Sequence, residues 1–171
     1  AQYLEMIKKG ARPYTTYDIT MDGWFEKVVP ALVFSKHSSS SKHSLLGKDL
    51  MDLSVSILSW VGSEERTRLE SDTKKGVSLK DYLKRGRIKS VKKSKNGISF
   101  EAGYKKYFID ELVRGDYDDD GYEDSIIYCG RHYIEGTGRS YSCYIVKRKD
   151  ESKACTVEYF DYKIPKKIFT K

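Results

Sequence analysis

The stretch RIKSVKKSKNGISFEAGYKKYFID, residues 87–110, decides the fold class of this chain. After Gly86 the apolar period changes, and Asn96 and Gly97 stand between the two runs RIKSVKKS (87–94) and ISFEAGY (98–104). Asn-Gly between two such runs favours a β-hairpin closed by a type I′ turn. KKYFIDELVRGD (105–116) alternates well enough to add a further strand. The stretch therefore predicts the start of an antiparallel meander.

More strand signals follow as far as Pro165. SIIYCGRHYI (125–134) and SYSCYIVKRK (140–149) flank the turn sequence EGTG, and ACTVEYFDYKI (154–164) comes last. Before residue 87 the apolar spacing is helical. We therefore predict an α+β fold, in which N-terminal helices pack on a C-terminal antiparallel meander of about five strands.

The helical part is expected at two places. In 46–58 and the residues just beyond it, apolar residues recur at spacings of three and four, which predicts one helix with a buried face. SLKDYLKRG (78–86) predicts a short helix, with Ser78 as its cap, Asp81 in its first turn and Gly86 after its end. The charged segment SEERTRLESDTKKG (63–76) is expected to cover a helix end and an exposed loop.

Length and composition set the bounds on domain number and location. A chain of 171 residues is expected to form a single domain, residues 1–171, with a mainly helical part (1–86) and a β part (87–164). No apolar run approaches the roughly 18 residues that a membrane helix needs. We interpret Ala1 as the residue after a removed signal peptide, which predicts a periplasmic or secreted protein. A trimmed start is the alternative.

The segment DYDDDGYED (116–124) gathers five aspartates and one glutamate in a chain of net charge +7. Carboxylates this close repel one another unless a cation lies between them. Counted from the first aspartate, acidic residues occupy positions 1, 3, 5 and 9, and a glycine at position 6 permits a sharp reversal. This spacing wraps hard oxygen ligands around Ca²⁺. The predicted ligands are Asp116, Asp118, Asp120, the carbonyl of Tyr122, and Asp124.

The same nine residues resemble the calcium loops of FG-GAP and integrin-type repeats, and are similar to dockerin and EF-hand loops. The resemblance covers residues 116–124 only. It departs from the EF-hand at position 12, where Ile127 stands in place of a bidentate glutamate, and a strand rather than a helix follows the loop. The resemblance therefore implies Ca²⁺ ligands in a strand–loop–strand setting, without the propeller that several such repeats build.

The three cysteines have a spacing that predicts a shared row. The midpoint of Cys129 and Cys143 falls in the EGTG turn, and that of Cys143 and Cys155 falls in KRKDESK (147–153). If both turns are hairpins, the three residues lie side by side on neighbouring strands. We predict a Cys143–Cys155 disulfide in an oxidising compartment. Three reduced thiols in the core are the alternative.

No catalytic constellation stands out in the sequence. We therefore predict a non-enzymatic, exported calcium-binding protein whose ion is structural, and which binds a protein or cell-envelope partner as an inhibitor or immunity protein does. An envelope-associated hydrolase or accessory enzyme that uses the acidic metal site is the alternative. The basic segment 84–95 lacks a nucleic-acid-binding signature, so we expect no nucleic-acid partner.

Overall fold

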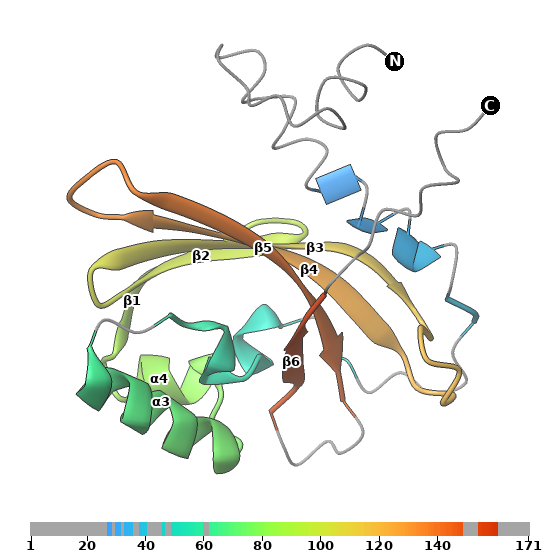
Figure 1. Ribbon diagram of the computed structural model, residues 1–171, viewed down its shortest axis with the longest axis horizontal. Helices are drawn as coiled ribbons and strands as arrows, with labels where there is room; N and C mark the ends of the chain where they lie inside the picture. Colours follow the sequence, from blue (N-terminus) through green and yellow to red (C-terminus); the bar gives the residue numbers. More distant parts are fainter. Residues whose placement is uncertain are drawn as a thin grey trace.

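The computed structural model describes residues 27, 28, 30, 31, 33–35, 38–40, 46, 49–59, 62–148 and 154–160. These residues form a six-stranded antiparallel sheet with short helical segments (Figure 1). The described chain is therefore mostly β with some helix. In sheet order the strands are β1 (Ile88–Lys93), β2 (Gly97–Ala102), β3 (Lys105–Gly115), β4 (Asp124–Tyr133), β5 (Arg139–Lys147) and β6 (Thr156–Tyr159).

Strand order follows chain order, so the predicted antiparallel meander is confirmed. The predicted number of about five strands is wrong, because every strand-like segment in the sequence forms a strand of its own. The helices also do not make the continuous N-terminal layer that we expected. They are short and separated by irregular segments.

The first hairpin turns differently from the prediction. The last β1–β2 pair is Lys93 with Ile98, and Ser94 donates its N–H to the carbonyl of Gly97 at 2.8 Å. Neither Asn96 nor Gly97 has a positive φ, so the predicted type I′ turn is wrong. Gly97 is required here because there is no room for a side chain at this position. A Cβ at residue 97 would lie 2.6 Å from the carbonyl oxygen of Ile109 on the next strand.

Both faces of the sheet are covered by apolar side chains. On one face lie α3 (Ser63–Lys74), α4 (Leu79–Lys84) and two 3₁₀ turns, η1 (Leu50–Asp52) and η2 (Val55–Ile57). The main core lies between these segments and the strands; among its members are Val55, Ile57, Leu79, Ile88, Phe100, Tyr107, Ile109, Ile127 and Cys129. A smaller core on the opposite face contains Val33, Phe34, Ile126, Tyr128, Cys143, Ile145 and Phe160.

The predicted helix over 46–58 is wrong. Most of its apolar residues are buried as expected, but the described backbone forms only the two short turns η1 and η2, and Leu46, Leu53 and Leu58 lie outside them. Asp49 and Ser54 each accept a backbone N–H two residues ahead, and such local bonds compete with a continuous helix. The backbone between the two turns is also bonded elsewhere, since the N–H of Ser54 donates to the carbonyl of Cys155.

The charged segment that we expected to cover a helix end and a loop is instead the helix α3. Only Leu69 and Asp72 are buried along this helix. Its sequence therefore lacks the apolar stripe by which an amphipathic helix is predicted. Its support includes the pair Arg66 and Glu70, which lie one turn apart. Among the helical segments that the structure describes, none has the length and apolar character needed to cross a bilayer.

The start of α4 confirms the sequence prediction and carries a testable pH effect. The hydroxyl of Ser78 accepts the N–H of Asp81, and the carboxylate of Asp81 accepts the N–H of Ser78. The pKa of Asp81 is lowered from 3.8, first by the N–H of Ser78 and then by the hydroxyl of Ser78, which also donates to this carboxylate at 2.8 Å. A lowered pKa means that the stabilisation is present above pH 3.8 and is lost as the pH falls through the folded-state value.

Asp81→Ala is therefore expected to lower the free energy of unfolding at pH 7 by about 0.5 to 1 kcal/mol. Urea unfolding at a series of pH values measures the difference. The gap between wild type and variant should close under acid conditions, below pH 3.8. Lys80→Ala, an exposed change on the same helix, is the control. A gap that persists unchanged in acid would contradict the capping role.

The predicted row of three cysteines does not form. In the β4–β5 register Cys143 faces Tyr128 and Cys129 faces Ser142, so Cys129 and Cys143 point to opposite sides of the sheet. Cys143 lies in the smaller core and Cys155 in the main core. All three are buried, free thiols. The structure therefore does not support the predicted Cys143–Cys155 disulfide, because the last hairpin is centred past residue 149.

Candidate metal centre

The acidic loop connects the two central strands of the sheet. β3 ends at Gly115 and β4 begins at Asp124, and these two residues form the last pair of the β3–β4 ladder. A bulge between Glu111 and Val113 interrupts the ladder just before the loop. Beyond the bulge the two strands are paired again as far as Gly115 and Asp124, so the loop starts directly from the ladder.

Backbone N–H groups inside the loop converge on carboxylates. Asp116 is 3% exposed; its Oδ1 accepts the N–H of Asp120 at 3.1 Å, and its Oδ2 accepts that of Gly121 at 2.8 Å. Asp124, at the far end, accepts the N–H of Tyr117 at 3.0 Å. Gly121 has a φ of 88°, which glycine adopts without strain. The loop is thus folded tightly around its own aspartates.

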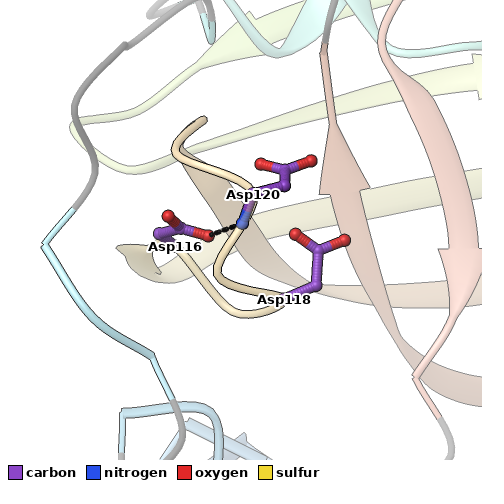
Figure 2. Close-up of side chains that lie close together, drawn as sticks. All are labelled: Asp116, Asp118 and Asp120. Carbon is purple, nitrogen blue, oxygen red and sulfur yellow. Dashed lines mark hydrogen bonds between the residues drawn. The ribbon is translucent and has the colours of Figure 1, made fainter.

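Three of the predicted ligands come together. Carboxylate oxygens of Asp116, Asp118 and Asp120 all lie within 4.8 Å of one another (Figure 2). This grouping alone does not distinguish calcium from other cations. The remaining predicted side-chain ligand, Asp124, lies outside this group and bonds to the backbone. Tyr122 donates its N–H to Oδ1 of Asp120 at 2.9 Å, while the role of its carbonyl stays a prediction.

The carboxylates of the loop repel one another, and this repulsion contributes to a raised pKa at Asp124. The pKa of Asp124 is raised to about 6: burial is the largest cause and the negative charges of Asp118 and Asp120 add to it, while the N–H of Tyr117 and the charge of Lys147 act against the rise. An acid that holds its proton this strongly sits in a site that favours added positive charge. A divalent cation in the loop would supply that charge.

A lysine from β5 already supplies part of the positive charge at the loop. Nζ of Lys147 lies 2.5 Å from Oδ2 of Asp118. Burial lowers the pKa of Lys147, but the hydrogen bond and charge of Asp118 outweigh burial, so the pKa is raised overall. This partner could not be predicted from local pattern, because 29 residues separate Lys147 from Asp118 and only the β4–β5 pairing brings them together.

A second neighbour comes from the serine-rich segment near residue 39. The backbones of Ser39 and Asp116 exchange two hydrogen bonds, at 2.8 and 3.0 Å. Ser39 and Ser40 also line a cavity of about 540 Å³ together with Asp116, Asp119, Asp120, Gly121 and Tyr122. The loop is therefore open to solvent on a side rich in oxygen atoms.

Two further acidic residues of the loop have other partners. Asp119 has a φ of 58° and accepts the hydroxyl of Ser39 at 2.9 Å. Glu123 pairs with Arg114, which also binds Glu111. Both carboxylates lie outside the three-aspartate group.

No protein-family model, curated protein or solved structure matches this chain. Any assignment of function therefore rests on the chain's own residues.

Proposed function

We propose that loop 116–124 binds Ca²⁺ and that the ion is structural. The observation that supports this most strongly is the meeting of Asp116, Asp118 and Asp120 within 4.8 Å, at the positions that the sequence spacing assigns to ligands. Ca²⁺ takes six to eight oxygen ligands in a flexible arrangement, whereas Mg²⁺ keeps more of its water. A loop with several carboxylates, a nearby carbonyl and access to solvent suits the larger ion better.

Binding would rearrange the ion pair at the loop. The ammonium of Lys147 pairs with Asp118, and Ca²⁺ would replace it as the counter-charge. Lys147 then moves into solvent, at low cost because a surface ion pair contributes only about 0 to 1 kcal/mol. The ion would fix the connection between the two central strands, where the bulge and the positive φ of Asp119 leave the backbone irregular.

The wider function that we propose is that of an exported, non-enzymatic module that binds a protein or envelope partner. Its support is the exposure of tyrosines in the β part: Tyr104 is 76% and Tyr159 is 67% exposed. Tyrosine is enriched at binding interfaces because it joins apolar area to a hydrogen-bonding tip. Within the described residues, the acidic loop has no adjacent histidine or cysteine that would favour the enzymatic alternative.

A thermal melt in excess EDTA, followed by addition of Ca²⁺ or Mg²⁺, tests the calcium assignment. Free calcium at 100 times its dissociation constant would add about 2.7 kcal/mol of stability. For a chain of this length we expect a rise in Tm of about 5 to 10 °C. Mg²⁺ at the same concentration should produce a smaller rise. An identical Tm with and without Ca²⁺ would leave the loop an unmetallated turn.

A further inference from the structure

The end of the sheet opposite the acidic loop carries a cluster of exposed apolar side chains. It is built from the β2–β3 turn and the β4–β5 turn, which lie side by side because Ile134 donates its N–H to the carbonyl of Tyr104 at 2.9 Å. Tyr104 is 76%, Ile134 52% and Tyr133 46% exposed. We call these three residues the tip cluster. Figure 1 shows both turns at one end of the sheet and the β3–β4 loop at the other.

A row of basic side chains lies directly behind the tip cluster. Lys106 on β3 pairs with His132 on β4, and His132 pairs with Arg139 on β5. Directly paired residues share a face of the sheet, so these side chains stand in one line across three strands. Burial, then the charges of Arg139 and Lys106, lowers the pKa of His132, so the imidazole is neutral at pH 7. Lys106 and Arg139 supply the positive charge of this basic row.

The charge of this end is opposite to that of the acidic loop. Segments 101–106 and 131–139 contain four lysines or arginines and two glutamates, a net charge of +2. The loop 116–124 contains six acidic residues and no basic one. An anionic surface would therefore favour contact with the tip end over contact with the loop end.

We propose that the tip cluster and the basic row dock this protein on an anionic lipid bilayer. Tyr104, Tyr133 and Ile134 would enter the headgroup region, where tyrosine is favoured because its ring is apolar and its hydroxyl is polar. Lys106 and Arg139 would lie against the lipid phosphates, as basic residues do at negatively charged membrane surfaces. The site shares no residue with the calcium loop, so it stands whether or not that loop binds an ion.

A bilayer fits this end better than a single-stranded nucleic acid. Base stacking needs free ring faces. The aromatic residues beside the basic row already have ring partners: Phe108 packs against His132 with centroids 5.0 Å apart, and Tyr141 stacks on Tyr128 with centroids 5.7 Å apart. The most exposed groups project from the turns instead. One of them, Ile134, is aliphatic and cannot stack on a base.

Co-sedimentation with vesicles tests the proposal. Wild type is expected to bind phosphatidylcholine vesicles that contain phosphatidylglycerol, to bind pure phosphatidylcholine vesicles more weakly, and to lose affinity as salt rises. Two independent double variants, Tyr104→Ser with Ile134→Ser and Lys106→Gln with Arg139→Gln, should each weaken binding by about tenfold or more.

Matched controls change the same chemistry elsewhere. Leu83→Ser with Tyr159→Ser replaces two exposed apolar side chains, and Lys92→Gln with Lys95→Gln removes two exposed charges. Both should stay within about twofold of wild type. Failure of wild type to bind the anionic vesicles would overturn the proposal. So would equal losses in the controls, or binding to a single-stranded oligothymidylate without binding to vesicles.

Discussion

Phe100→Ala is expected to lower the free energy of unfolding by about 3 to 5 kcal/mol, which is a large part of the stability of a typical domain. Phe100 is fully buried on β2 and stacks on Tyr107 of β3 with ring centroids 5.2 Å apart. Its removal leaves a cavity between the sheet and the helical segments on the main-core face. Urea unfolding followed by circular dichroism measures the loss.

Phe108→Ala is the matched control for that substitution. Phe108 lies on β3, the strand paired with β2, and is only partly buried, against His132 on the outer face. We expect a loss of about 1 kcal/mol. Equal losses for the two variants would show that the main core does not lie where the structure places it.

The second large effect concerns calcium binding by the acidic loop, residues 116–124. Asp118→Asn keeps the shape of the side chain and removes a ligand charge, and we expect at least about a tenfold weaker calcium affinity. At a calcium concentration 100 times the wild-type dissociation constant, the added stability should fall from about 2.7 to about 1.4 kcal/mol. In EDTA the variant should differ little from wild type, because only a surface ion pair with Lys147 is lost.

Asp119→Asn is the control, since it removes the same charge from the adjacent residue. Asn tolerates the positive φ of residue 119, and its side-chain oxygen can still accept the hydroxyl of Ser39. Calcium stabilisation should survive in this variant almost in full. If the two variants lose calcium stabilisation equally, the loop acts through its total charge and not through placed ligands.

Much of the sheet could be predicted from local pattern. In β3, Tyr107 and Ile109 are buried, whereas the alternate residues Phe108 and Asp110 are only partly buried. Successive side chains of a strand point to opposite faces of the sheet, so the sequence predicts this alternation. Ser78 and Asp81 predicted the start of α4, because a capping box is formed by two residues that lie three positions apart. Both features depend only on residues close together in the chain, so they can be predicted without knowledge of the tertiary structure.

Features decided by distant partners could not be predicted. The segment near Leu53 has helical spacing, yet its backbone bonds to residues near 78 and 155 and breaks into two 3₁₀ turns. The cysteine row failed because it assumed symmetric hairpins, and a shift of one residue moves a side chain to the other face. α3 was not predicted because its sequence is polar almost throughout.

The candidate site divides in the same way. The spacing of aspartates predicted the meeting of Asp116, Asp118 and Asp120, because alternate positions of a tight loop turn inward. It did not predict Lys147 or Ser39, which tertiary pairing brings to the loop from other segments. It also placed Asp124 with the ligands, whereas the structure uses this buried carboxylate to bond the N–H of Tyr117.

The most direct test of the central claim is an isothermal calorimetric titration of metal-free protein with Ca²⁺, repeated with Mg²⁺ and with Asp118→Asn. We predict one saturable calcium site per chain, with a dissociation constant on the order of 10⁻³ M or tighter, as in extracellular calcium modules. Binding of Mg²⁺ and of the variant should be weaker. A titration that shows no saturable calcium binding, or one that Asp118→Asn leaves unchanged, would contradict a calcium site at residues 116–124.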